Sequence, residues 1–163
     1  MSKVSRVQYR NQKSLRIERM TEHDLLEVVE IEEACGLSRW GWSAYHNELK
    51  DGHGGLMLVV RSASADEKHL AAFIVSRLVA DELHVNNIAV RPAYRRKGIG
   101  GTLLKRVLDV GGLVGARLAV LEVRDSNRVA QALYERYGFQ IVGRRTEYYS
   151  NPTEDALIMR AAL

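Results

Sequence analysis

A basic segment rich in glycine, residues 95–101, has the composition of an anion-binding turn. It reads Arg-Arg-Lys-Gly-Ile-Gly-Gly, and it joins a strand-like segment to one with helical spacing. The glycines let the backbone turn tightly, so that several N–H groups point at one spot. These N–H groups, the positive end of the helix dipole and the flanking cations together favour phosphate.

Two common phosphate-binding motifs do not fit this segment. A dinucleotide fingerprint needs Gly or Ala three residues after its second glycine, where Leu103 stands. A P-loop needs Gly-Lys-Ser/Thr after a four-residue gap, which is missing here. A glycine turn without a ligand is the alternative that the segment alone leaves open.

The remaining composition is that of an ordinary globular protein. The chain has 163 residues, of which 46% are apolar and 27% charged, and this argues against disorder and fibrous structure. No apolar run approaches the roughly 18 residues of a membrane span. Cys35, the single cysteine, can neither form an intramolecular disulfide nor complete a zinc motif. We therefore expect a cytoplasmic protein with no metal and no membrane partner.

The net charge of +4 is distributed unevenly. The first thirteen residues contain no acid and four basic residues, which are Lys3, Arg6, Arg10 and Lys13. Because such basic tails are commonly solvated arms, we expect a flexible tail over 1–13 and a single domain over 14–163. A nucleic-acid-binding arm or a transit-like segment is the alternative for the tail.

Hydrophobic periodicity predicts an α/β (α+β) chain with the element order β-α-α-β-β-β-α-β-α-β-β. Helices are expected near residues 22–35, 43–50, 98–110 and 127–137. Strands are expected near residues 14–18, 56–61, 70–78, 82–90, 118–123, 139–142 and 156–159. The expected buried face of the first helix comprises Leu25, Leu26, Val29 and Ile31.

The stretch from Asn87 to Met159 resembles the GNAT family of acyl-CoA-dependent N-acetyltransferases. Residues 95–100 match its Arg-x-x-Gly-x-Gly pyrophosphate loop, residues 87–90 resemble its cofactor-binding strand, and residues 133–139 resemble its closing helix. Residues 121–127 and 148–156 resemble, more narrowly, the RimI group, which acetylates protein N-termini, notably that of a small-subunit ribosomal protein. The resemblance implies the GNAT fold, a mixed and mostly antiparallel sheet of about seven strands flanked by about four helices.

The resemblance also implies acetyl-CoA as the cosubstrate. By position, the pantetheine arm would pair with the backbone of Ile88, Ala89 and Val90. The pyrophosphate would lie on Arg96, Lys97, Gly98, Ile99, Gly100 and Gly101. Asn127 would add a further contact, and as an ordinary helix cap it could serve both purposes.

Two residues correspond to the catalytic pair of the RimI group, Glu122 as general base and Tyr134 as general acid. An α-ammonium with a pKa of about 8 must lose a proton before it attacks the thioester, and the departing thiolate gains from a proton donor. The alternatives are an ion pair between Glu122 and Arg124, and packing of Tyr134 on Phe139. His84, on the strand before the phosphate loop, is a second candidate for the base.

One departure from the RimI pattern affects the acceptor side. Where relatives have Pro-Trp-Ser, this chain reads Gly41-Trp42-Ser43. Trp40 and Trp42 are expected either to line the acceptor pocket or to staple the start of a helix.

The expected function is therefore transfer of acetyl from acetyl-CoA to a protein N-terminus, the N-terminal alanine of a small-subunit ribosomal protein. One alternative is a GNAT enzyme that acetylates a small amine, a lysine side chain or an antibiotic. Another is a domain that binds acyl-CoA or RNA without catalysis. No direct nucleic-acid binding is expected, because aromatic residues make up only 7% of the chain and form no stacking platform.

Overall fold

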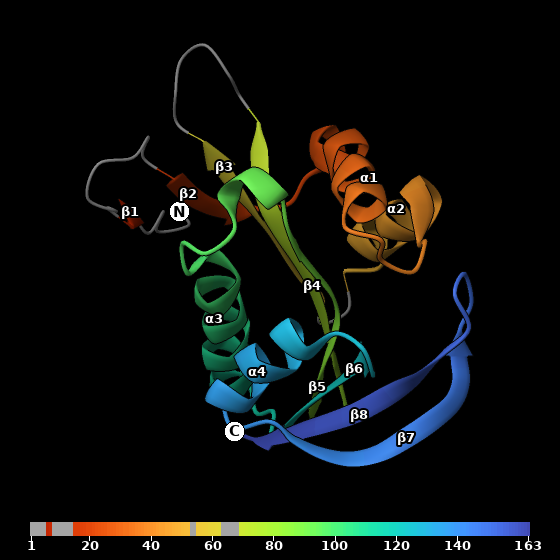
Figure 1. The fold of residues 1–163 in the computed structure, drawn as a ribbon. Helices are drawn as coiled ribbons and strands as arrows, with labels where there is room; N and C mark the ends of the chain where they lie inside the picture. The colour runs from red at the N-terminus through yellow and green to blue at the C-terminus, as the bar shows by residue number, and fades with distance from the viewer. Residues whose placement is uncertain (1–5, 8–14, 53–54, 63–68) are drawn as a thin grey trace. The chain divides into compact units, whose positions relative to one another are not determined.

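The computed structural model describes residues 6–7, 15–52, 55–62 and 69–163 (Figure 1). Within these residues lie four α-helices, seven strands of five residues or more, and a two-residue strand β1 (Arg6–Val7). Apart from β1 and two short 3-10 turns, the elements follow the predicted order, so the predicted fold class is confirmed. Three basic residues of the expected tail, Lys3, Arg10 and Lys13, lie outside the described residues.

The chain forms two compact units. The first ends at Val75 and resumes over residues 87–104, and the second comprises residues 76–86 and 105–163. Strands β4 (Leu70–Val79) and β5 (Glu82–Val90) and helix α3 (Ile99–Leu113) each contribute residues to both units. The expected single domain over 14–163 stays a prediction, as does the flexible tail.

The first unit combines the strands β1 to β4 with two helices, α1 (Leu25–Ala34) and α2 (Gly41–Asp51). Strand β2 (Leu15–Arg19) pairs antiparallel with both β1 and β3 (Gly55–Ser62). The core of this unit gathers apolar side chains from both helices and from the sheet, among them Leu25, Val28, Ile31, Tyr45, Val59 and Phe73. Burial of these side chains fixes α1 and α2 on the sheet.

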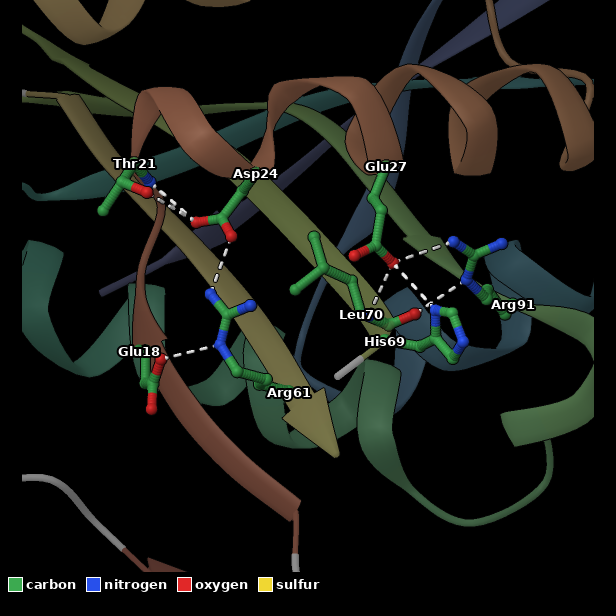
Figure 2. A network of polar contacts seen from close by, with 8 residues as sticks. All are labelled: Glu18, Thr21, Asp24, Glu27, Arg61, His69, Leu70 and Arg91. Carbon is green, nitrogen blue, oxygen red and sulfur yellow. Dashed lines mark hydrogen bonds and ion pairs between the residues drawn. The ribbon is translucent and has the colours of Figure 1, made fainter. Parts of the chain in front are cut away.

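Figure 2 shows how charged side chains tie α1 to the sheet. Arg61 on β3 donates from Nη2 to Asp24 Oδ1 at 2.7 Å and from Nε to Glu18 Oε2 at 3.0 Å. Asp24 Oδ2 also accepts the backbone N–H of Thr21 at 2.9 Å, at the start of the 3-10 turn Glu22–Asp24 that leads into α1. The buried Asp24 carboxylate therefore joins the start of the helix to β3.

The second unit is organised around β6 (Leu118–Arg124). This strand pairs parallel with the first half of β5 and antiparallel with β8 (Glu154–Ala162), which in turn pairs with β7 (Gln140–Tyr149). Side chains of β6 alternate strictly between buried and half-buried, as expected for a strand with one covered face. Helix α4 (Arg128–Arg136) follows β6.

Several boundaries differ from the prediction. Helix α3 continues through Gly111 and Gly112 to Leu113, so these glycines do not end it. Strands β7 and β8 are longer than expected, and β7 continues to Tyr149, well past the predicted end near residue 142. In the described part of the chain, no helix is long and apolar enough to cross a membrane.

We expect Asp24→Ala to lower the free energy of unfolding by about 2 kcal/mol, because it leaves Arg61 and the Thr21 N–H without a buried partner. Urea denaturation of the full chain measures this change. Glu22→Ala is the matched control, since within the described ranges the Glu22 side chain has one partner, His46, in an exposed pair, and it should change stability by less than about 0.5 kcal/mol. Equal losses in the two variants would contradict the anchoring role of Asp24.

Candidate active site

The glycine-rich loop has the backbone conformation of an anion nest. Arg96 has φ +61° and Gly98 has φ +76°, so two left-handed residues alternate just before α3. Such an alternation turns successive N–H groups toward one point. The first helical N–H groups, those of Ile99, Gly100 and Gly101, donate to no residue in the described part of the chain. Several backbone donors at the start of α3 are therefore available to an anion.

The cations of this loop differ in what they already bind. Arg95 donates from Nε to the Val90 carbonyl at 3.0 Å and from Nη2 to Cys35 Sγ at 3.4 Å. Lys97 lies over the ring of Tyr94, 5.5 Å from its centroid. Arg96 is exposed and forms no ion pair with any described residue. The side chain of Ile99 is buried in the core, so only its backbone could contact a ligand.

Arg91, which directly follows β5, holds the end of that strand in place. Its Nε donates to the Leu70 carbonyl at 2.7 Å, and its Nη2 lies 3.2 Å from Glu27 Oε2 (Figure 2). Glu27 Oε2 also accepts the Leu70 N–H at 2.8 Å. One carboxylate on α1 thus fixes both the start of β4 and the residue that enters the loop.

The predicted pantetheine strand, Ile88 to Val90, forms the last part of β5. The parallel ladder with β6 pairs Glu82–Val85 with Leu118–Leu121, and Ile88 comes after the last of these pairs. Next to it, the buried Asn87 donates to the Tyr45 hydroxyl at 2.9 Å, and that hydroxyl donates to Glu32. The core of the first unit therefore anchors this end of β5.

Glu122 lies on the half-buried face of β6, and its partners come from β7. Arg145 Nε lies 2.8 Å from Glu122 Oε1. The hydroxyl of Tyr148 donates to Glu122, and this hydrogen bond raises the pKa of Tyr148 above its ordinary value. The expected alternative, a pair between Glu122 and Arg124, does not form, because Arg124 Nη1 lies 3.4 Å from Glu154 Oε2.

Tyr134 lies on α4 with 6% of its surface exposed. Its ring is 5.9 Å from that of Phe139, so the predicted packing is present. Burial raises the pKa of Tyr134, and the nearby Tyr149 adds to the effect, so the phenol stays protonated at neutral pH.

Tyr149 interacts electrostatically with both Glu122 and Tyr134. Burial and the negative charge of Glu122 raise the pKa of Tyr149 to about 12. The guanidinium of Arg124 lies 4.3 Å from the centroid of its ring. The second unit thus brings Glu122, Tyr134 and the paired tyrosines together. Sequence reasoning missed Arg145 as the partner of Glu122, since nothing in its spacing from Glu122 signals the contact.

Asn127 caps α4, as predicted, because its Oδ1 accepts the Ala130 N–H at 3.1 Å. The preceding turn is fixed by Glu154, whose Oε1 accepts the Ser126 N–H at 2.6 Å. Hydrogen bonds from the side chain and the backbone N–H of Ser126, together with the pair with Arg124, hold the pKa of Glu154 below its usual value.

His84 faces the same side of the sheet as Glu122. It pairs with Val120, two residues before Glu122 on β6, and its Nε2 lies 3.0 Å from Glu82 Oε2. The two tryptophans lie in different environments, and a role in the acceptor pocket stays a prediction for both. Trp40 packs against Tyr45 and the core, with ring centroids 5.3 Å apart, whereas Trp42 is exposed and stacks on His46. In the described ranges, no group of three or more His, Cys, Asp or Glu side chains could hold a metal ion.

The chain is similar to known proteins along most of its length. The model of the acetyltransferase (GNAT) family matches residues 25–139. The N-alpha-acetyltransferase RimI of Mycobacterium tuberculosis is 35% identical over 145 residues, which are 86% of this chain and 88% of that protein. The crystal structure of the ribosomal-protein-S18-alanine N-acetyltransferase from Escherichia coli is 32% identical, with a TM-score of 0.80 over 91% of this chain and 93% of that chain.

A second similar structure shows the fold alone. It is the NatC complex bound to Gag peptide and CoA, which is 20% identical to this chain. The TM-score is 0.79 over 91% of this chain and 98% of that chain.

Proposed function

Because the chain belongs to the acetyltransferase (GNAT) family, we propose that it transfers the acetyl group of acetyl-CoA to the N-terminal α-amine of a protein. The proposed acceptor is the N-terminal alanine of a small-subunit ribosomal protein, as in the name of the Escherichia coli relative. The proposal rests on one observation: the carboxylate of Glu122 and the protonated phenol of Tyr134 lie in the same compact unit. The reaction would take place in the cytoplasm, where ribosomal proteins are made.

The loop over 95–101 suits the pyrophosphate of acetyl-CoA. Its first helical N–H groups and Arg96 have no partner among the residues that the structure describes, and together with the positive end of the helix they favour a group with negative charge. The backbone of Ile88, Ala89 and Val90 would pair with the pantetheine arm. The Val90 carbonyl already accepts a hydrogen bond from Arg95, so it is less available for this pairing. Asn127 can contact the cosubstrate with its amide nitrogen while its oxygen caps α4.

In the proposed reaction, Glu122 takes a proton from the acceptor ammonium, directly or through a water molecule. The neutral amine attacks the thioester carbonyl, the tetrahedral intermediate collapses, and coenzyme A leaves as a thiolate. Tyr134 donates its proton toward that sulfur. Because burial keeps Tyr134 protonated, the donor is present throughout the neutral pH range.

The choice of an α-amine over a lysine side chain rests on the cost of deprotonation. The pKa of lysine, about 10.4, lies roughly 2.5 units above that of an α-amine, so deprotonation at neutral pH costs on the order of 3.5 kcal/mol more. A single half-buried carboxylate is better matched to the smaller free-energy cost of deprotonating an α-amine. Tyr148 and Tyr149, whose rings lie 5.1 Å apart at the end of β7, are suited to holding the first residues of a peptide.

The direct test is release of coenzyme A thiol from acetyl-CoA in the presence of short peptides that differ in their first residue. We expect the highest kcat/KM for a peptide that begins with alanine, and mass spectrometry should place the acetyl group on its α-amine. Acetylation of lysine side chains alone would contradict the proposal.

We expect Gly98→Val to weaken acetyl-CoA binding about tenfold or more, because φ +76° is strained for a β-branched residue. The effect is conformational, since a Cβ at Gly98 would have no described heavy atom within 4 Å. Calorimetry of the folded variant measures it. Gly112→Ala, inside α3, is the control and should leave affinity unchanged. Unchanged affinity in Gly98→Val would remove the loop from the site.

Tyr134→Phe is expected to fold normally and to lose about 10²- to 10⁴-fold in kcat, since it removes only the hydroxyl of the proposed acid. The affinity for acetyl-CoA should change little. Steady-state kinetics with an alanine-starting peptide measure both quantities. A kcat within about threefold of the wild type would reassign Tyr134 to packing on Phe139.

Glu122→Gln is expected to slow acetylation about 10²-fold at pH 6.5, where nearly all of the substrate amine is protonated and needs the base. Around pH 9.5 the α-amine is largely neutral, given its pKa of about 8, so the loss should shrink below about tenfold. The measurement is kcat/KM for the peptide across this range, with the exposed Glu135→Gln as control.

A loss in Glu122→Gln that stays constant over this pH range would indicate a structural role and reject the base. His84→Gln provides the competing test. If it alone shows the defect at low pH, His84 is the base.

A further inference from the structure

Arg145 and Tyr148 reach the same carboxylate although they lie three residues apart on one strand. In a regular strand, residues separated by an odd number of positions face opposite sides of the sheet. The two side chains are also close to each other, with the Arg145 guanidinium 5.6 Å from the centroid of the Tyr148 ring. An irregularity between them must therefore reverse the alternation.

The irregularity is a bulge in β7. Arg145 pairs with Ala156 and Tyr149 pairs with Glu154, so the three residues 146–148 stand opposite Asp155 alone. At the centre of the bulge, Glu147 has φ +52°, a left-handed conformation that is uncommon for a residue other than glycine. Such a conformation persists only where the surrounding contacts impose it.

Asp155 supplies those contacts. Its Oδ1 accepts the Glu147 N–H at 2.8 Å, and its Oδ2 accepts Arg144 Nη1 at 2.8 Å. Its backbone carbonyl also accepts the Asp125 N–H at 3.1 Å, so the residue itself is tied to the segment after β6. One side chain on β8 thus holds the bulge both at its centre and at the residue before Arg145.

We propose that Asp155 is a positioning residue for the acceptor side of the site, because its clamp on Glu147 holds Arg145 and Tyr148 together on the Glu122 carboxylate. The inference rests on the proposed function, in which Glu122 receives the acceptor amine. Without the clamp, β7 can relax to regular alternation, and either Arg145 or Tyr148 then turns away from Glu122. The Asp155 side chain contacts Glu147 and Arg144, both on β7, so we expect its effect to be confined to the acceptor.

The test measures kcat/KM for an alanine-starting peptide and, separately, KM for acetyl-CoA. Because small misplacements at a reacting centre cost one to two powers of ten, we expect Asp155→Ala to lower kcat/KM for the peptide about tenfold or more. The KM for acetyl-CoA should stay within about twofold. Asp155→Asn keeps an oxygen that can accept the Glu147 N–H, and it should recover most of the loss.

Two further variants separate positioning from charge. Asp125→Ala is the matched control, because Asp125 binds the same Arg144 atom at 2.9 Å but its side chain does not contact the bulge, and it should stay within about twofold of the wild type. Asp155→Glu keeps the charge but moves the carboxylate by one methylene. It should lose activity severalfold, and it keeps the test decisive if Asp155→Ala does not fold.

A double-mutant cycle identifies the route of the effect. On a Tyr148→Phe background, Asp155→Ala should cost about threefold or less, because the two changes remove parts of the same arrangement. Losses that multiply in full would show that Asp155 acts elsewhere and would overturn the proposal, as would wild-type kinetics in both Asp155→Ala and Asp155→Glu.

The outcome also distinguishes this inference from the proposed function. If the wild type releases no thiol with any peptide, or Glu122→Gln is fully active at every pH, the function or the base assignment is wrong, and Asp155 has no acceptor to position. If the wild type is active and Glu122→Gln is slow, while Asp155→Ala equals the wild type, only the inference on Asp155 fails.

Discussion

Pairing between arginine and carboxylate side chains fixes the strands that carry the candidate site residues in each of the two units. In the first unit, Arg61 and Arg91 bind Asp24 and Glu27, and each pair joins a residue of the sheet region to the start of α1. In the second unit, Arg124 binds Glu154 and Arg145 binds Glu122. Exposed ion pairs contribute little to stability, but most of these side chains are at least two-thirds buried. Removing one partner of such a pair breaks a strong hydrogen bond and leaves the other partner unsatisfied. Where the regular hydrogen-bond ladders end, these ion pairs help to hold the backbone in place.

The loop before α3 differs from these pairs, and the difference suits an anion site. Arg96 and Lys97 have no carboxylate partner among the described residues, whereas Arg91, Arg124 and Arg144 each pair with an acid. The free N–H groups of Ile99, Gly100 and Gly101 add partial positive charge at the same place. An unpaired cluster of this kind is stable on a solvated surface and becomes neutral when a diphosphate binds. The diphosphate of acetyl-CoA would therefore supply the negative charge that this positive cluster lacks.

Much of the fold could be predicted from the sequence because periodicity reports which face of an element is covered. The strand over 82–90 was predicted at its observed bounds, and all the helices were found. The buried face of α1 was partly wrong, since Val28 is buried while Leu26 is 72% exposed. The 3-10 turn over Glu22–Asp24 sets the rotation at which α1 begins, and residues at i and i+3 then face the core. Gly111 does not stop α3 because it serves packing, as a Cβ there would lie 2.8 Å from the Leu83 side chain.

The acceptor side could not be predicted in the same way, because it depends on a break in periodicity. From the sequence, Arg124 is the natural partner for Glu122, as both lie on the same face of one strand, two residues apart. Residues at that spacing are separated by about 6.6 Å along the strand, however, and each finds a closer partner from a neighbouring strand. Glu154 takes Arg124, and the bulge in β7 delivers Arg145 and Tyr148 to Glu122. The bulge in turn needs an acceptor at the position opposite its centre, and only the fold places Asp155 there. A motif can therefore identify which carboxylate reacts, but the groups that orient it follow from strand register, which the order of residue types does not encode.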